Sequence, residues 1–186
     1  MLFVIPVILI SIGVVPDGGR FVVLAGVFLA TLWIVVHEHW SYKTLGIRAD
    51  NIAHSVFPYT LFTIVMVILL IGLAFILGKS PDAQWYLNPH LIFLFIPISL
   101  VQEFLYRSFL MQELTLLHLR SFYLIIINTL LFAFLHIIYA SPFIIIPITF
   151  FAGLGFAWMF RRYPNFYLIG TSHAVLNFVA VLYNFF

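Results

Sequence analysis

The chain has 186 residues, of which 65% are hydrophobic and only 8% are charged. A soluble domain is nearer half apolar and a quarter charged, so this composition excludes an ordinary water-soluble protein and indicates an integral membrane protein. A net charge of +2 argues against a nucleic-acid partner, and the absence of cysteine excludes disulfides, thiol catalysis and Cys-bound zinc. Long apolar runs without alternation favour helices over a barrel. We therefore predict an all-α, polytopic transmembrane helical bundle with about six to seven membrane segments, forming a single domain over residues 1–186 within the lipid bilayer.

Seven apolar segments, separated by polar turns, follow one another along the chain. The first lacks the basic start and the cleavage site of a signal peptide, so we expect a retained short helix. The first two segments are short for a hydrocarbon core of ~30 Å and are expected to form a tilted or partly inserted hairpin. The predicted segments are Leu2–Val15, Phe21–Val36, Val56–Gly78, Leu91–Leu119, Tyr123–Tyr139, Phe143–Phe160 and Phe166–Phe186.

Two of these segments carry signals of how they pack. Leu91–Leu119 is longer than the hydrocarbon core at ~1.5 Å per residue, and Pro97 is placed to bend it. The sixth segment has small residues at every fourth position, a spacing that lets helices approach closely. These small residues are Thr149, Gly153 and Ala157.

Basic residues are divided unequally between the loops. The loops after the first, third and fifth segments hold only Arg20 and Lys79, whereas the other loops hold more basic residues. The basic residues after the second, fourth and sixth segments are Lys43, Arg48, Arg120, Arg161 and Arg162. By the positive-inside rule we expect a cytoplasmic N-terminus and an outer C-terminus, in a prokaryotic cytoplasmic membrane.

The middle of the fourth segment carries two charges, Glu103 and Arg107. A charge at bilayer depth costs at least ~2.5–3.5 kcal/mol on insertion scales. Because the two residues are four apart, they share a helix face and can partly neutralise each other. They are either an ion pair that fixes helix packing or part of an intramembrane functional site, and the second interpretation is the default at this depth.

Two later segments add further polar groups. His136 lies near the end of the fifth segment, and His173 and Asn177 lie four apart on the last one. A single membrane histidine is often only hydrogen-bonded between helices, but each of these groups is unfavourable in lipid. Polar residues on three helices therefore predict one shared site.

The three patterns resemble those of the CAAX protease and bacteriocin-processing family of intramembrane peptidases, also called the Abi family. That family has EExxxR, FxxxH and HxxxN motifs, each on its own transmembrane helix. This chain has Gln102-Glu103-Phe104-Leu105-Tyr106-Arg107, then Phe132-Ala133-Phe134-Leu135-His136, then His173-Ala174-Val175-Leu176-Asn177. The resemblance covers a family-like core over residues 91–177.

The resemblance implies hydrolysis of a peptide bond in a membrane-anchored, C-terminally lipidated or sorted protein substrate. In the family, the first glutamate and the histidine of the second motif activate a water molecule. These positions are Gln102 and His136 here. His173 and Asn177 would stabilise the oxyanion, and Arg107 would hold the second glutamate, Glu103. An imidazole N–H and an amide NH₂ are suitable donors to a developing alkoxide.

Gln102 departs from the family pattern, because an amide is not a usable general base at neutral pH. Three explanations remain open. Gln102 is an introduced inactivating change, or it is natural and Glu103 serves as the base, or the chain is a natural pseudoenzyme.

Other interpretations of the same residues also remain. Glu103, His136 and His173 could supply a zinc site with an open position. We favour the version without metal or other cofactor, because Asn177 suits an oxyanion donor better than a ligand. A non-catalytic binding or chaperone subunit that grips a transmembrane partner is an alternative from another class. A small proton-coupled transporter is a third, although internal repeats are absent.

Overall fold

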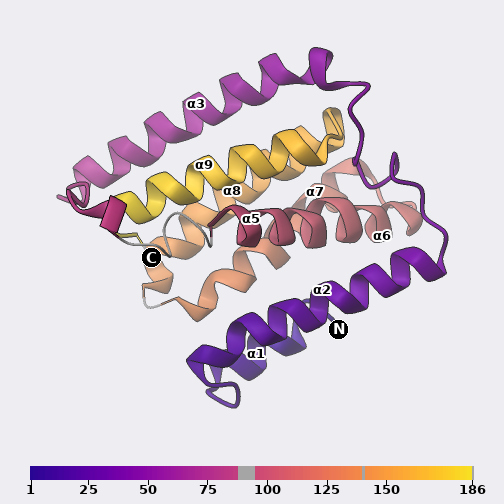
Figure 1. Cartoon of the computed structure of the whole chain (residues 1–186), viewed down its shortest axis with the longest axis horizontal. Coiled ribbons are helices and arrows are strands. Elements are labelled where there is room, and N and C mark those ends of the chain that lie inside the picture. Colours follow the sequence, from indigo (N-terminus) through magenta and orange to yellow (C-terminus); the bar gives the residue numbers. More distant parts are fainter. Residues whose placement is uncertain (88–94, 140, 186) are drawn as a thin grey trace.

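The computed structural model describes residues 1–87, 95–139 and 141–185. Within these ranges all regular structure is helical (Figure 1). The α-helices are α1 (Ile5–Ser11), α2 (Arg20–His37), α3 (Ile52–Ile76), α5 (Phe95–Glu103), α6 (Met111–Leu116), α7 (Ser121–Leu135), α8 (Pro142–Arg162) and α9 (Phe166–Leu182). A π-helical segment, η3 (Phe104–Leu110), joins α5 to α6. Short 3-10 turns are η1 (Asp17–Gly19), η2 (Trp85–Leu87) and η4 (His136–Ile138).

The predicted all-α membrane bundle is confirmed. Four helices of the described chain are long and apolar enough to cross a membrane. They are α2, α3, α7 extended by η4, and α8. Helix α9 is a shorter apolar helix, and α5, η3 and α6 follow one another as a continuous helical run. The N-terminal segment is shorter than predicted, because Gly13 adopts a left-handed φ of 77° just beyond α1.

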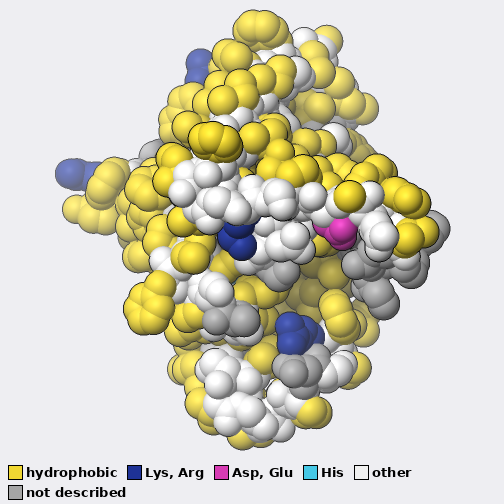
Figure 2. Space-filling model, turned by 90° about the vertical axis from the view of Figure 1, so that its left-hand side faces the viewer, with side chains coloured by type: hydrophobic (Ala, Val, Ile, Leu, Met, Phe, Trp, Pro, Cys, Tyr) yellow, Lys and Arg dark blue, Asp and Glu magenta, His cyan; other side chains and the backbone are white. Residues whose placement is uncertain are grey.

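The helices pack around the run that contains η3. Helix α9 contacts α5 on one side and α3 on the other, so α3 is an outer helix (Figure 1). Helices α7 and α8 pack on each other, and α1 and α2 lie at the opposite edge of the bundle from α3 (Figure 1). The end of the molecule with the C-terminus is largely apolar, with isolated charged side chains (Figure 2).

The fourth apolar segment is not a uniform α-helix. Pro97, where we expect a bend, lies near the start of α5, and a departure from α-helical geometry lies further along, at η3. All seven residues of η3 are buried, and they include Arg107. A single π-helical turn inside an α-helix often marks a functional site, because it shifts the phase of the following side chains.

The expected stripe of small residues on α8 lies against α7. Gly153 is buried beside the ring of Phe132, and a Cβ at that position would lie 2.8 Å from a ring carbon. Thr149 and Ala157, one turn away on either side, are also buried. The missing side chain therefore lets α7 and α8 approach closely, which is what the spacing predicted.

Asn165 fixes the start of α9, the helix that carries the third motif. Its Oδ1 accepts a hydrogen bond from the backbone N–H of Leu168 at 3.0 Å, as an N-cap does. Its Nδ2 donates to the carbonyl of Arg48 at 2.9 Å and to Oδ1 of Asn51 at 2.7 Å. These bonds tie α9 to the loop before α3.

Candidate active site

Glu103 lies at the centre of the site, fully buried at the end of α5. Its Oε1 is 2.7 Å from Nδ1 of His173 on α9. Its Oε2 is 3.3 Å from Nε of Arg107, one turn further along the chain. The predicted pair of Glu103 and Arg107 is therefore present, and His173 joins it as a third member.

Arg107 is also fully buried, and its charge is compensated from several directions. Its contact with Glu103 is an ion pair without hydrogen-bond geometry, since Nε makes no hydrogen bond within the described residues. Its Nη2 donates to the carbonyl of Gly153 at 3.3 Å. The guanidinium also lies over the ring of Phe132, 4.2 Å from the ring centre, in a cation–π contact.

A side chain on α7 donates a hydrogen bond to the π-helical backbone. Asn128 donates from Nδ2 to the carbonyl of Tyr106 at 2.6 Å, and both residues are buried. A π-helical turn disturbs the regular i to i−4 bonding, so such a carbonyl benefits from a side-chain donor.

A cavity of about 520 Å³ lies beside this cluster. Three of its lining residues are the predicted His136, His173 and Asn177, and the others are mostly apolar. The cavity reaches the outer surface of the bundle, because it is also lined by the exposed side chains of Leu69 on α3 and Phe151 on α8. Its remaining lining residues are Met66, Leu70, Leu73, Phe132, Pro147, Ile148, Thr149, Ala152, Phe156, Leu176 and Ala180.

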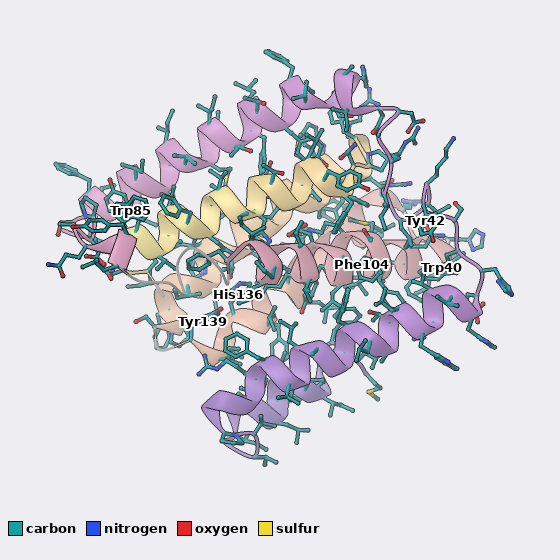
Figure 3. All side chains as sticks on the ribbon, in the orientation of Figure 1. Trp40, Tyr42, Trp85, Phe104, His136 and Tyr139 are labelled. Carbon is teal, nitrogen blue, oxygen red and sulfur yellow. The ribbon has the colours of Figure 1, made fainter. Side chains whose placement is uncertain are left out.

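His136 begins η4, where α7 ends, and lies in the middle of the molecule (Figure 3). Its Nδ1 is 2.8 Å from the carbonyl of Phe132, and its ring stacks on Tyr139. The ring of Phe132 contacts both site histidines, with centroids 4.8 Å from that of His136 and 5.6 Å from that of His173. The two imidazoles thus contact the same aromatic residue.

Asn177 is positioned by a residue that sequence reasoning missed. Its Nδ2 donates to Oγ of Ser99 on α5 at 3.0 Å, and Ser99 is fully buried. The signal was available, because Ser99 lies four residues before Glu103 and so shares its helix face.

Gln102 is the predicted site residue that the structure places apart. It lines a smaller cavity of about 210 Å³ between the N-terminal helices and the start of η3. None of the described residues lines both cavities. Neighbouring residues on a helix point ~100° apart, so Gln102 faces away when Glu103 faces His173.

The candidate zinc ligands are not grouped as a metal site would be. Among the residues that the structure describes, no three His, Asp or Glu side chains are placed to hold a metal ion. Glu103 instead contacts a ring nitrogen of His173 and the guanidinium of Arg107.

Comparison with known proteins identifies the family. The sequence matches the family model described as type II CAAX prenyl endopeptidase Rce1-like over residues 83–179, just over half of the chain. No curated protein and no solved structure matches the chain. The matched stretch contains all three motifs, so the resemblance that they indicated is confirmed. The chain belongs to the type II CAAX prenyl endopeptidase Rce1-like family.

Proposed function

We propose that the protein is an intramembrane endopeptidase of the glutamate type, which hydrolyses a peptide bond of a membrane-anchored or C-terminally lipidated protein without a metal ion. The observation that carries this proposal is the cavity lined by His136, His173 and Asn177 beside the buried Glu103. A family of prenyl endopeptidases provides the expected reaction class.

The cavity supplies the two functions that peptide hydrolysis needs. An imidazole can accept a proton from water, and an amide NH₂ can donate to the developing oxyanion. His173 and Asn177 lie one turn apart on α9, so both can reach one bound peptide group. The apolar surroundings keep bulk water away and strengthen these interactions.

The substrate class follows from the cavity walls. A volume of about 520 Å³ lies within the range of small-ligand pockets, roughly 300–1,000 Å³. Apolar side chains from α3, α8 and α9 form most of the lining and suit a lipid chain or an apolar C-terminal tail. The polar groups of the cavity would then meet the peptide bond next to that chain.

We further propose that the protein lies in a prokaryotic cytoplasmic membrane with its N-terminus inside and its C-terminus outside. The loop before α3 and the end of α8 carry four of the eight Lys and Arg residues. Both lie at the same end of the bundle, because Phe166 donates its N–H to the carbonyl of Gly46 at 2.8 Å. The positive-inside rule favours a cytoplasmic position for that end.

The direct test is cleavage of a farnesylated peptide that ends in a CAAX sequence and carries a fluorophore and a quencher. We expect the chain, purified in lipid nanodiscs, to cleave this probe in the presence of EDTA. We expect Asn177→Ala to lower the rate ~10²–10³-fold, as loss of one oxyanion donor does. The proposal fails if neither the chain as it stands nor its Gln102→Glu variant cleaves the prenylated probe or a probe with an apolar transmembrane tail.

Gln102 supports one alternative, a non-catalytic subunit that binds a membrane partner. An amide in place of the first glutamate of the motif is what a pseudoprotease would have. In that case both forms would bind the labelled probes with similar affinity, and mass spectrometry would find only intact peptide.

A further inference from the structure

We propose that His173 is the general base of this peptidase and that Glu103 is its positioning residue, so that the protein is active with Gln102 in place. This inference rests on the proposed function. It assigns water activation to a pair of side chains on α5 and α9 that are bonded at 2.7 Å.

Gln102 has neither the chemistry nor the position for this step. Its amide cannot take a proton from water at neutral pH. It also lines the smaller cavity, on the side of α1 and α2, and not the cavity of His173. The base must therefore be found among the groups that line the larger cavity.

Glu103 is close to that cavity but is not among its lining residues. It is fully buried, its Oε1 is taken by Nδ1 of His173, and its Oε2 is paired with Arg107. A water molecule bound beside a peptide in the cavity would meet His173 first. Glu103 can therefore influence the reaction only through its imidazole partner.

The bond to Glu103 determines which nitrogen of His173 is available. An ionised carboxylate only accepts hydrogen bonds, so Nδ1 of His173 must carry the proton. In the neutral ring this leaves the lone pair on Nε2, on the other side of the ring from Glu103. His173 lines the cavity, and Nε2 makes no hydrogen bond to a described residue. The arrangement has the logic of the carboxylate–histidine pair in serine hydrolases, where the carboxylate fixes the tautomer and stabilises the imidazolium.

His136 is the competing base, and the partner of its Nδ1 is neutral. Its Nδ1 is bonded to the neutral carbonyl of Phe132 at 2.8 Å. Hydrogen bonds to an ionised partner are roughly twice as strong as neutral ones, so a carboxylate supports an imidazolium better than a carbonyl does. The carboxylate bonded to its Nδ1 thus suits His173 to hold the proton of the water, and we assign to His136 the role of orienting that water.

The reaction balances with these groups. An O–H bond of the water breaks, its proton passes to Nε2 of His173, and the water oxygen bonds to the scissile carbonyl carbon. The carbonyl oxygen takes the electron pair and the negative charge, beside the Nδ2–H of Asn177. When the carbonyl re-forms, the C–N bond breaks and His173 returns its proton to the leaving amine. One water is consumed for each peptide bond, and His173 is regenerated.

The test compares variants at positions 102, 103 and 173 on the farnesylated CAAX probe. Glu103→Gln keeps the shape of the side chain but removes the charge that stabilises the imidazolium. We expect it to lower kcat ~10²–10⁴-fold while KM stays within about threefold. His173→Gln should lower kcat at least as much. Gln102→Met, the matched control in the neighbouring cavity, should keep kcat within about threefold of the unchanged chain.

A spectroscopic measurement keeps the test decisive if Glu103→Gln folds poorly. In protein labelled with ¹⁵N-histidine, His173 should show a strongly deshielded Nδ1 proton, assigned by its loss in His173→Gln. Its presence in the unchanged chain supports the bond to Glu103 without any variant at position 103, and its absence would contradict that bond.

Two outcomes separate the possible failures. If only Gln102→Glu cleaves the probe, and adding Glu103→Gln to it leaves that activity intact, the base belongs to position 102 and this inference is overturned. If no form cleaves any probe, the proposed function itself is wrong. Cleavage by the unchanged chain that is lost with Glu103 and His173, but not with Gln102, supports the inference.

Discussion

Arg107 shows how the bundle tolerates a full charge at its centre. Glu103, the carbonyl of Gly153 and the ring of Phe132 each offset part of that charge. None of these contacts would suffice alone, because moving an unpaired ion out of water costs several kcal/mol. The ion pair also leaves Oε1 of Glu103 available for His173.

Removing Arg107 should therefore destabilise the protein strongly. Arg107→Ala leaves the buried carboxylate of Glu103 without its cationic partner, and we expect a loss of ~3–5 kcal/mol of stability. Thermal unfolding in detergent measures this loss. Arg161→Ala, at an exposed position near the end of α8, is the control and should unfold at the temperature of the unchanged chain. Equal unfolding temperatures for both variants would show that the pair is not buried.

The sequence was sufficient to place Glu103 near His173 and Asn177, because all three are polar residues at membrane depth, on two different helices. It could not tell that Gln102 lies outside the cavity. Two adjacent residues differ by ~100° around a helix, and which one faces the site depends on how that helix is rotated. Ser99, which bonds Asn177, was missed although it shares the helix face of Glu103, because a lone serine in an apolar helix is only a weak signal.

Helix packing in this bundle depends on close approach between α7 and α8. The approach brings Phe132 against Gly153, and Phe132 in turn covers Arg107 and contacts both site histidines. A small residue on one helix therefore supports the geometry of a site formed by three others.

Gly153→Ala should consequently disturb both stability and activity. The new Cβ would lie 2.8 Å from the ring of Phe132, so the helices must separate or the ring must move. We expect a loss of ~1–3 kcal/mol, as for other overpacked positions, together with slower cleavage of the farnesylated probe. Gly72→Ala on α3 is the matched control, because nothing lies within 4 Å of its added Cβ. If both variants behave alike in thermal unfolding and cleavage, the close approach does not support the site.

The π-helical segment η3 should become less stable when its side-chain donor is removed. Asn128→Leu removes the donor to the carbonyl of Tyr106 and leaves a buried acceptor unpaired, which typically costs ~1–3 kcal/mol. Amide hydrogen exchange should then speed up in η3, while exchange in α3 stays the same. Uniform exchange rates before and after the substitution would mean that Asn128 does not hold this turn.

The helices themselves were largely predictable, but their irregularities were not. Long apolar runs bounded by Gly, Pro and Asn fix where a membrane helix begins and ends, so the predicted Phe143–Phe160 and the observed Pro142–Arg162 nearly coincide. The π-helical turn left no such pattern, and its bond to Asn128 is a contact with another helix that the local sequence does not reveal. The start of the predicted Leu91–Leu119 lies outside the described residues.

The two ends of the whole molecule differ in charge and in how their loops are tied together. At one end, the loop before α3 is bonded to the start of α9 through Asn165 and Asn51. At the other end, Lys79 donates from Nζ to the carbonyl of Asn184 at 2.6 Å, which places the end of α3 beside the C-terminus. Figure 2 shows this second end, where a few separate charged side chains lie among other polar and backbone atoms and hydrophobic side chains surround them.

The orientation of the protein in the membrane can therefore be tested by labelling one residue near each end of the bundle. The chain has no cysteine, so a single introduced thiol can be labelled without background. Tyr42 and Ser80 are both exposed, and they lie before the start and after the end of the long helix α3. With the basic end inside, Ser80→Cys in intact cells should react with a membrane-impermeant maleimide, whereas Tyr42→Cys should react only after the membrane is opened. Labelling of both residues in opened membranes controls for accessibility. The reverse pattern in intact cells would place the basic loops outside and overturn the proposed orientation. It would leave the assignment of His173 unaffected, because the cavity lies within the bundle.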